Sequence, residues 1–517
     1  MANYIPMPAP YRGQNDLVPL TSLGPEFCEI STNFNLDDTR AVLRHGDSIF
    51  ATKSGKLPLN LSTYGSGGSE VLFMVYDNGG ATGLKVDDIS SGTPSTVYAP
   101  GGVGGDDEIQ TLFFNNYLFF FGEVTWRPSS VGNPTWNGSA WGLSGYTYST
   151  MTTPFGGCVY KNRAYILEKG SSKFAYSGIA SITGAMTEVD LSQIISRKGN
   201  LYGIRSVSLS EGVQQENVLC FIFDTGEVLV YAGSYPNSAD WGLVGRFVVS
   251  PPVYYNSFVD ARGDSFIITI SGLVSLRSLF TQGASVAVTE SLSKNIPTRW
   301  KQVFGYDWAS TGLNICIKGS YDQSKDRIII TLPFYVSHAG GTPSQLATHR
   351  MIYSFRTGSW TEHVVVVPSS LLVVTSTMYK NNFYYGETGG VLKAEASSGF
   401  VDDLLTGSTY AVQFQLRLAP IPSQKTNLQK LEGWDLIMKS DLYSEATYQV
   451  RSDLGTQSSD YQAIPLQSTS LIKSYLNLGI EGSFIQLDVI GDAATGKTIG
   501  LEYHAYNAIM ETGSGSR

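Results

Sequence analysis

The sequence predicts an all-β protein: a β-propeller, with an extended N-terminal arm and a smaller C-terminal β domain. Three observations support this prediction. The chain is rich in Gly (55), Tyr (30) and Phe (24), but only 15% of its residues are charged, so the straight-chain residues that favour helices are scarce. Short aromatic or β-branched runs alternate with Gly, Asn, Asp and Ser, as strands and turns require. One turn motif also recurs along the chain.

The length of the chain indicates more than one domain. At 517 residues it exceeds the size at which single cores stop growing, about 250 to 300 residues. We expect an arm over residues 1–34, a propeller over 35–400 and a β-sandwich-like domain over 401–517. The arm has little periodicity and contains five prolines, so it cannot form a core. We therefore expect it to lie against its own propeller or a neighbouring subunit.

Strands are predicted wherever β-branched or aromatic runs are bounded by turn residues. In the propeller region the clearest lie at residues 71–76, 217–223, 228–231, 266–270, 327–332 and 363–367. Beyond residue 400, strands are predicted at 410–418, 434–439, 483–490 and 499–506. The recurring turn motif is absent from that part, which favours a separate β domain.

The turn motif places Asn third in a six-residue pattern that starts and ends on an aromatic residue. It occurs at Phe114-Asn115-Asn116-Tyr117-Leu118-Phe119, Tyr160-Lys161-Asn162-Arg163-Ala164-Tyr165 and Tyr379-Lys380-Asn381-Asn382-Phe383-Tyr384. Because Asn tolerates positive φ, the motif predicts a hairpin turn that leads into a buried strand. Looser counterparts lie at 45–47, 224–227, 262–264 and 325–327, so turn markers recur at a spacing of roughly 40 to 70 residues. Such a repeat is typical of propeller blades, and a string of β-sandwiches is the alternative.

Charge and cysteine usage limit the functions to consider. The formal net charge is −9, so the totals indicate no basic surface for gripping nucleic acid. Cys28, Cys158, Cys220 and Cys316 are too far apart for a C-x-x-C pair and are predicted to be free, buried thiols. Residues 1–14 lack a signal-peptide core, and no apolar run reaches the roughly 18 residues of a membrane span. We expect synthesis in a cytoplasm and no membrane insertion.

The segment Gly491-Asp492-Ala493-Ala494-Thr495-Gly496-Lys497-Thr498 matches the phosphate-binding pattern G-x-x-x-x-G-K-[ST]. A working loop of this kind needs a strand before it and a helix after it. Residues 484–490 form the strand, but residues 499–506 alternate with a period of two and predict another strand. We therefore interpret Gly491, Gly496, Lys497 and Thr498 as a hairpin loop and expect no cofactor.

No catalytic or metal site is predicted, and the chain is expected not to be an enzyme. His45, His338, His349, His363 and His504 form no short-range ligand pair, and each is expected to be a surface or packing residue. The acidic clusters 37–38, 106–108 and 402–403 are candidates for paired glycosidase carboxylates. Because neighbours on a strand point to opposite faces, we expect solvated turns there instead. Aromatic runs at 119–121 and 384–385 suit either sugar stacking or core packing.

A resemblance to a known family adds to this interpretation. Residues 226–236, Gly-Glu-Val-Leu-Val-Tyr-Ala-Gly-Ser-Tyr-Pro, followed by Asp240-Trp241-Gly242-Leu243-Val244-Gly245, resemble tail nozzle proteins of short-tailed bacteriophages, also called tail tubular or packaged-DNA stabilisation proteins. Further segments agree in order: Asp16-Leu17-Val18-Pro19-Leu20, Asn33-Phe34-Asn35, Arg44-His45-Gly46, Gly263-Asp264, Ser271-Gly272-Leu273-Val274, Tyr321-Asp322, Ile328-Ile329-Ile330-Thr331, Tyr353-Ser354-Phe355 and Gly358-Ser359-Trp360-Thr361. The resemblance covers residues 16 to about 390.

The resemblance implies a structural protein of the virion tail. It implies a six-bladed propeller in each subunit and a homo-hexamer that surrounds the DNA channel below the adaptor ring. Its expected partners are the adaptor, tail fibres or spikes, and double-stranded DNA that passes without specific binding. The negative charge of each copy opposes tight phosphate binding and favours sliding. The alternative is a glycan-binding or glycan-cleaving receptor module of the tail.

Overall fold

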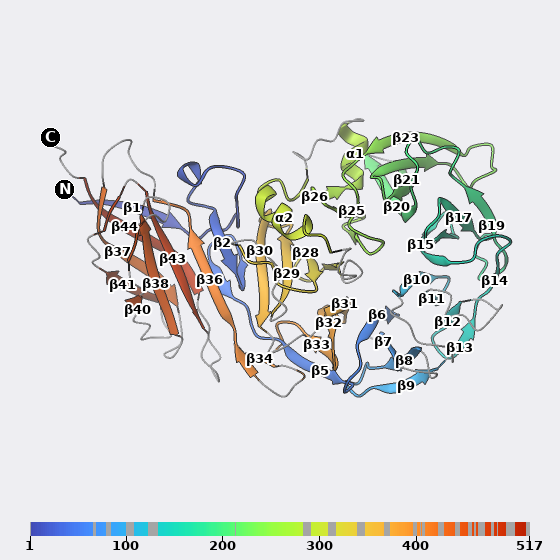
Figure 1. Ribbon diagram of the computed structural model, residues 1–517, viewed down its shortest axis with the longest axis horizontal. Helices are drawn as coiled ribbons and strands as arrows, with labels where there is room; N and C mark the ends of the chain where they lie inside the picture. Colours follow the sequence, from blue (N-terminus) through green and yellow to red (C-terminus); the bar gives the residue numbers. More distant parts are fainter. Residues whose placement is uncertain are drawn as a thin grey trace.

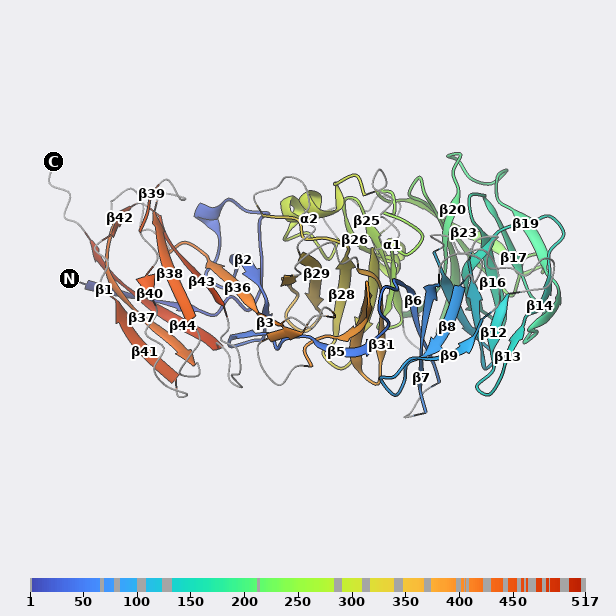
Figure 2. The same ribbon diagram turned by 60° about the horizontal axis from the view of Figure 1, so that its bottom comes forward.

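The computed structural model describes residues 2–65, 69–78, 84–99, 108–122, 133–211, 214–282, 291–308, 317–338, 347–366, 373–396, 401–403, 405, 409–421, 429–439, 445–452, 457–459, 462–463, 471–476, 480–482, 484–492 and 502–512. Two bodies lie side by side along the long axis of the molecule (Figure 1 and Figure 2). One is a ring of small sheets, and the other is a pair of facing sheets.

In the described residues, the ring contains six self-contained sheets and one sector of a larger sheet (Figure 1). From the axis outward, the six sheets are β6 (Pro58–Tyr64), β7 (Val71–Asp77), β8 (Leu84–Asp88) and β9 (Ser95–Tyr98); β10 (Gln110–Phe114), β11 (Tyr117–Phe121), β12 (Pro134–Trp136) and β13 (Trp141–Leu143); β15 (Pro154–Tyr160), β16 (Arg163–Glu168), β17 (Lys173–Tyr176) and β19 (Thr187–Asp190); β20 (Leu201–Glu211), β21 (Gln214–Phe223), β22 (Glu227–Ala232) and β23 (Gly242–Val248); β24 (Phe258–Ala261), β25 (Asp264–Thr269) and β26 (Gly272–Ser275); and β31 (Val373–Tyr379), β32 (Asn382–Glu387), β33 (Gly390–Lys393) and β5 (Ser48–Thr52).

The remaining sector of the ring is β27 (Lys318–Asp322), β28 (Arg327–Leu332), β29 (Ala347–Ser354) and β30 (Ser359–Val366), which belongs to a ten-stranded sheet. The ring closes where β31 contacts β6 and where β5, from early in the chain, pairs with β33. The predicted all-β propeller is therefore confirmed. The described ring contains the six self-contained blades that the resemblance implies and, in addition, the blade that is shared with the larger sheet.

The recurring turn motif forms the hairpin between the first two strands of a blade. In the three full copies both central residues have positive φ: 49° and 64° at Asn115 and Asn116, 45° and 58° at Lys161 and Asn162, and 46° and 59° at Lys380 and Asn381. Two-residue hairpins of this kind match the right-handed twist of the flanking strands. The looser counterparts at 262–264 and 325–327 connect β24 to β25 and β27 to β28 in the same place. The motif therefore marks equivalent positions in these five blades, whereas the counterpart at 224–227 lies between β21 and β22, the second and third strands of their sheet, and the one at 45–47 precedes β5.

The strands predicted in the propeller are confirmed. The runs at 71–76, 217–223, 228–231, 266–270 and 363–367 overlap β7, β21, β22, β25 and β30, and the run at 327–332 coincides with β28. Their side chains are buried almost without interruption, as in β28, where all six residues are buried. Such strands are covered on both faces, because neighbouring blades pack face to face.

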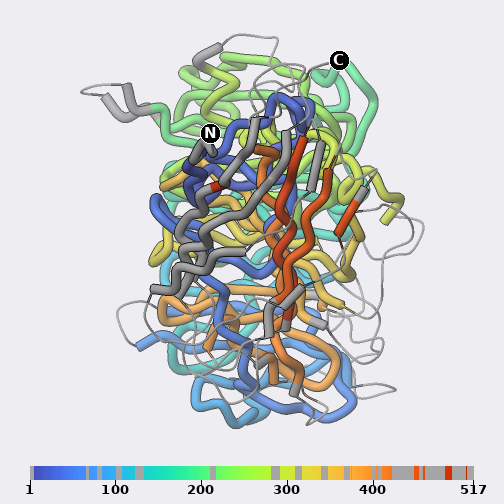
Figure 3. The backbone as a smooth tube through the Cα atoms, turned by 90° about the vertical axis from the view of Figure 1, so that its left-hand side faces the viewer, coloured from blue at the N-terminus to red at the C-terminus, as the bar shows by residue number. Residues whose placement is uncertain are grey.

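The second body is a two-sheet sandwich (Figure 3). One sheet continues from β30 through β2 (Cys28–Thr32) into β36 (Gln413–Leu418), β43 (Ile485–Asp492), β38 (Glu445–Ser452), β39 (Gln457–Ser458) and β40 (Gln462–Ala463). The other contains β3 (Phe34–Leu36), β4 (Ala41–Leu43), β44 (Glu502–Thr512), β37 (Gln429–Lys439), β41 (Leu471–Leu476), β1 (Ala2–Pro8) and β42 (Ile480–Gly482). Phe34, Leu43, Phe414, Val450 and Leu487 belong to the core between them.

The N-terminal segment is built into both bodies. β1 pairs with β44, and β2 pairs with both β30 and β36. Asp16 accepts hydrogen bonds from the backbone N–H groups of Thr298 and Arg299, at 3.0 and 2.6 Å. It thus satisfies the free N–H groups at the start of α2 (Pro297–Phe304). Residues 1–34 therefore dock on their own chain, and β3 and β4, placed in the propeller by sequence, belong to the sandwich.

The other described elements are small. They are η1 (Leu20–Ser22), α1 (Leu276–Gln282), the parallel pair β14 (Gly145–Thr147) with β18 (Thr183–Ala185), and the pair β34 (Val401–Asp403) with β35 (Thr409–Ala411). In the described part of the chain no helix has the length and apolarity needed to cross a membrane. Cys28 and Cys220 are buried free thiols, Cys158 is a half-buried one, and Cys316 lies outside the described residues.

Candidate functional site

The propeller and the sandwich share one continuous sheet, and polar side chains fill the region where they meet. The sheet order is β27-β28-β29-β30-β2-β36-β43-β38-β39. β2 runs parallel to β30 through the pair Thr32 and Glu362, and antiparallel to β36. We call the junction the buried polar set Asn33, Arg44, Asp47, Arg299, Arg327, Arg350, Glu362, Glu395 and Asp402.

Asn33 continues the sheet with its side chain after β2 has ended. Its φ of 65° turns the backbone away, toward β3. The side-chain amide then bonds to both backbone polar groups of Val364: Oδ1 accepts from the N–H at 2.8 Å, and Nδ2 donates to the carbonyl at 2.8 Å. Nδ2 also donates to the carbonyl of Gln413 on β36, at 2.6 Å. One buried amide thus bridges the propeller strand and the sandwich strand.

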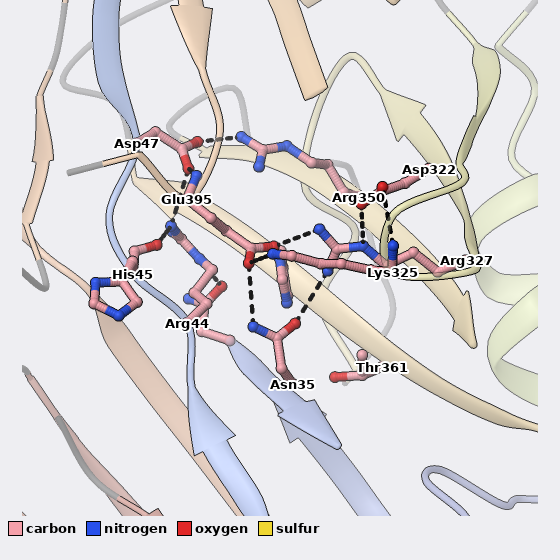
Figure 4. Close-up of polar contacts among 12 residues, drawn as sticks. Asn35, Arg44, His45, Asp47, Asp322, Lys325, Arg327, Arg350, Thr361 and Glu395 are labelled. Atoms are coloured by element: carbon pink, nitrogen blue, oxygen red, sulfur yellow. Dashed lines mark hydrogen bonds and ion pairs between the residues drawn. The ribbon is translucent and has the colours of Figure 1, made fainter. Parts of the chain in front are cut away.

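Arg44 is the centre of the first group of ion pairs (Figure 4). Its guanidinium makes two bonds to Asp402, of 2.8 and 2.7 Å, and its Nε donates to Asn33 Oδ1 at 2.8 Å. It also lies 3.3 Å from Asp47, which pairs with Arg350 of β29. Burial alone would raise the pKa of Asp47, but Arg350 and Arg44 hold it below its ordinary value. The Asp47 carboxylate therefore stays ionised and paired at neutral pH.

Glu395 organises a second group beside the first (Figure 4). Its carboxylate accepts from Arg327 of β28 at 2.8 Å, and Arg327 also bonds to Asp322 at 3.0 Å. Asn35 lies between the two charges: it accepts from Arg327 at 3.1 Å and donates to Glu395 at 3.3 Å. Although burial opposes ionisation, Arg327 and Lys325 lower the pKa of Glu395 well below its ordinary value. The segment after β33 is thereby fastened to β28 and β3.

Glu362 of β30 carries the third group. Arg299 of α2 bonds to both of its carboxylate oxygens, at 2.8 and 2.7 Å, and His349 Nε2 lies 2.7 Å away. His338 Nε2 lies 3.4 Å from the same carboxylate. Burial lowers the pKa of His338 to about 4 and also lowers the pKa of His349, so both rings are neutral at pH 7. Because the carboxylate only accepts, His349 must donate from Nε2.

The carboxylates of these three groups are paired with the guanidinium groups beside them, and this limits the reactions that they can support. Asp47, Glu362 and Glu395 each face a guanidinium at hydrogen-bond distance and are almost fully removed from solvent. A carboxylate held in this way is a poor proton acceptor, because its ionised form is stabilised. In the described residues no group of three His, Cys, Asp or Glu side chains could hold a metal ion. The arrangement suits fixing elements in place.

Glu387, at the end of β32, differs from the other acids of this region. It is fully buried, and neither carboxyl oxygen has a side-chain hydrogen-bond partner among the described residues, although the backbone N–H of Leu405 lies close enough to lower its pKa slightly. Burial, together with the negative charge of Asp47, raises the pKa of Glu387 to about 8. It is therefore mostly protonated at neutral pH and adds no further negative charge beside Asp47.

A cavity of about 510 Å³ lies beside Asn33, where β2 ends between β30 and β36. Its lining is Thr32, Asn33, Tyr335, Val364, Gln413, Phe414, Gln415, Thr447, Ile490 and Gly491. None of these residues carries a charge, so the cavity offers neutral polar and apolar contacts and no acid or base.

Side chains also cross the axis of the propeller. Gln110 of β10 donates to Asn256, which precedes β24, although two other blades separate these strands. Lys318 of β27 donates to Thr375 Oγ1 of β31, in the neighbouring blade, at 3.4 Å, and burial lowers its pKa to about 8. Polar contacts therefore join both neighbouring and non-neighbouring blades.

The structure places the histidines and corrects the acidic-cluster prediction at Asp402. His338, His349 and His363 come together in the junction, which sequence spacing did not reveal, whereas His45 is exposed. Asp402, expected in a solvated turn, is buried against Arg44. The other described acids of these clusters form no carboxylate pairs. Asp37 accepts from the backbone N–H groups of Thr39 and Arg40, and Asp38 pairs with Arg356 at the surface. Asp403 is half-buried and Glu108 is buried, whereas Asp106 and Asp107 lie outside the described residues.

The aromatic runs are core residues. Phe119, Phe120 and Phe121 are at most 1% exposed, and Tyr384 and Tyr385 at most 3%. Side chains so deeply buried cannot stack on a sugar ring. The sequence could not decide between these two roles, because a fully buried strand and an aromatic binding surface share the same composition.

The phosphate-loop pattern lies between strands of two different sheets. Gly491 is part of β43, which pairs with β36 and β38. Gly496, Lys497 and Thr498 lie outside the described residues. The next described element, β44, is a strand that pairs with β37, and β43 and β44 belong to different sheets; the predicted hairpin loop itself lies outside the described residues. The predicted strand at 499–506 overlaps β44.

Comparisons with known proteins report folds only. No protein-family model matches the chain, and no curated protein matches it. Among solved structures, Chaetomium thermophilum Raptor is 9% identical with a TM-score of 0.40, and the match covers 68% of this chain and 29% of that chain. BBS1N, in complex with ARL6DN, is 9% identical with a TM-score of 0.39 and coverages of 71% and 97%. An exo-β-1,3-galactanase from Phanerochaete chrysosporium is 9% identical with a TM-score of 0.25 and coverages of 78% and 95%.

Proposed function

We propose that this chain is a structural subunit of the tail nozzle of a short-tailed bacteriophage. Six copies would form a ring around the DNA channel in the virion tail, retain and conduct the genome, and contact the adaptor and the tail fibres or spikes. The chain would act without catalysis, metal or cofactor.

The observation that carries the proposal is where the family-like segments lie. Asn33 and Asn35, Arg44, Asp322 and Thr361 come from four of these segments, yet all lie in or beside the junction (Figure 4). Thr361, for example, donates to the carbonyl of Phe34 at 2.8 Å. Residues that agree with a family in order, and that also build one buried assembly, support descent from that family better than separate short matches.

The construction of the junction suits a load-bearing part. A continuous sheet joins the propeller to the sandwich, and three groups of buried ion pairs lie where the two bodies meet. Buried polar networks whose members are satisfied specify one arrangement of the elements that they connect. A subunit built in this way keeps its two bodies in a fixed relation, as a tail under internal pressure requires.

The proposed DNA passage lies between copies, outside each propeller. The contact between Gln110 and Asn256 spans blades that are not neighbours, so a duplex cannot thread the axis of one subunit. A ring of subunits would instead enclose a separate central opening.

The proposal is tested by the assembly state of the purified full-length chain. Light scattering after gel filtration should give the mass of six copies, and electron microscopy should show a ring with a central opening wide enough for duplex DNA. A chain that stays monomeric at every concentration contradicts the proposal. A monomer that binds or hydrolyses glycans on an array would instead favour the receptor module.

A further inference from the structure

The outer edges of the blades are not protected equally. Several described edges are short, such as β9 with four residues, β13 with three and β19 with four. The edge at β30 is covered by β2, and β26 leads directly into α1. β23, from Gly242 to Val248, is the outermost strand of its sheet and has seven residues. Another chain can pair with a long, uncovered strand edge, and β23 is longer than the edge strands β9, β13 and β19.

The side chains of β23 are apolar and unusually exposed. Leu243 is 43% exposed, Val244 60% and Val248 41%. Leu243 pairs with Tyr231 and Gly245 with Val230, so Val244 is the extra residue of a β-bulge, and its side chain is exposed together with that of Leu243. β22 pairs along one side of β23, and the other side has no strand partner in the described structure.

The edge is also almost free of charge. Arg246 is the charged residue of β23, and its guanidinium lies 3.5 Å from Glu227 and donates to the carbonyl of Ile194 at 2.6 Å. The chain as a whole carries −9, so two copies repel each other on average. A neutral apolar edge is a place where a second negative copy can approach without opposing like charges.

We propose that the outer edge of β23 is a contact surface for a second copy of this chain, an inference that rests on the proposed ring. A closed ring needs two different surfaces on each subunit, because each copy contacts one neighbour with one surface and the other neighbour with the other. The β23 edge supplies one of them. Backbone pairing along the strand gives affinity, and Leu243, Val244 and Val248 are buried by the neighbour.

The test introduces negative charge at the edge. In the double variant Val244→Glu, Val248→Glu, both new carboxylates replace exposed apolar side chains of β23 and would be buried unpaired in the contact. The variant should need at least about a hundredfold more protein to form the ring than the wild type does. Val97→Glu, on β9, where Val97 is 38% exposed, is the matched control and should assemble normally.

The outcomes separate the inference from the proposed function. A double variant that forms the ring at wild-type concentration overturns the assignment of β23 and leaves the nozzle proposal standing. A wild-type chain that never assembles overturns both. Loss of adaptor or fibre binding with an intact ring would assign the edge to another partner and overturn the inference.

A second measurement covers the case in which the double variant fails to fold. Hydrogen exchange of the wild-type chain should show slower exchange of the amides at residues 242–248 in the assembled ring than in diluted protein. Equal exchange in the two samples overturns the inference.

Discussion

The half of the propeller that faces away from the sandwich is packed mainly with aromatic rings, whereas the half that faces the sandwich combines aromatic packing with three groups of buried ion pairs. In the distal blades, Tyr231 stacks on Trp241 with centroids 5.1 Å apart, and Phe174 lies 4.6 Å from Phe221. Near the sandwich, Trp300 packs against Trp360, and buried arginines and carboxylates lie beside this aromatic core. One fold therefore uses two kinds of interior.

The difference lies in where the partners come from. The aromatic residues belong to the same or the next blade, so each blade completes its packing locally. The ion pairs join segments far apart in the chain, as in the pairing of Arg44 with Asp402. Apolar contacts tolerate small displacements, but a buried charge that loses its partner is strongly destabilising. The junction should therefore be the more sensitive half, to mutation and to pH.

The largest expected effect is at Arg44. Arg44→Met should lower the free energy of unfolding by about 3 to 5 kcal/mol, because Asp402 would remain buried without its guanidinium. Urea unfolding followed by tryptophan fluorescence measures the change. Arg356→Met is the control: its pair with Asp38 is 64% and 61% exposed, and its loss should cost under about 1 kcal/mol. Equal losses of unfolding free energy in the two variants would contradict the expected difference between a buried and an exposed ion pair.

The next effect depends on pH. The pKa of Glu387 is raised to about 8 in the folded chain, so the folded state holds a proton that the unfolded state releases above about pH 4.5. Its contribution to stability is fully present below pH 4.5 and is lost as the pH rises to 8. Glu387→Gln is neutral throughout and should become more stable relative to the wild type over this range, by as much as about 4 kcal/mol at pH 8.

The measurement for Glu387→Gln is urea unfolding of both proteins at pH 5, 6.5 and 8. A difference between the two proteins that stays constant over this range would mean that Glu387 does not titrate as inferred.

A smaller loss is expected at Asn33. Asn33→Ala should cost about 2 kcal/mol, because the N–H and carbonyl of Val364 would lose their buried partner. The matched control is Asn237→Ala, since Asn237 also has positive φ, 78°, but is exposed. Thermal unfolding of both variants measures the difference. If the two variants lose the same amount, the backbone conformation explains the loss and the amide bridge does not.

The smallest effect is expected in the distal half. Phe221 is fully buried against Phe174 and Tyr231, at 4.6 and 5.7 Å. Phe221→Leu keeps most of the apolar volume and should cost about 1 kcal/mol, with the same value at pH 5 and pH 8. A cost that varies with pH in urea unfolding would show that the aromatic half is coupled to the charged one.

Sequence reasoning predicted what is local. A β-branched run bounded by turn residues predicted β28 over Arg327–Leu332, and the tolerance of Asn for positive φ predicted the hairpins at Asn116, Asn162 and Asn381. Each of these features depends on a few adjacent residues, so a single sequence contains the information.

What sequence reasoning missed is long-range. Nothing near Asn33 shows that its amide will bond to Val364, because strand order and pairing are set by the whole fold. The one usable signal was in β29 and β30, where His349, Arg350 and Glu362 interrupt apolar runs. Charged residues in a strand that is buried on both faces must find partners, so such interruptions predict a buried polar cluster.

The pairing of β1 with β44 has a consequence for how the protein is made. β1 leaves the ribosome long before its partner, Glu502–Thr512, has been synthesised. β5 likewise cannot pair with β33 until that later strand has been synthesised. A nascent or truncated chain therefore carries unsatisfied strand edges at its beginning, which ribosome-associated chaperones must shield until translation has passed residue 512.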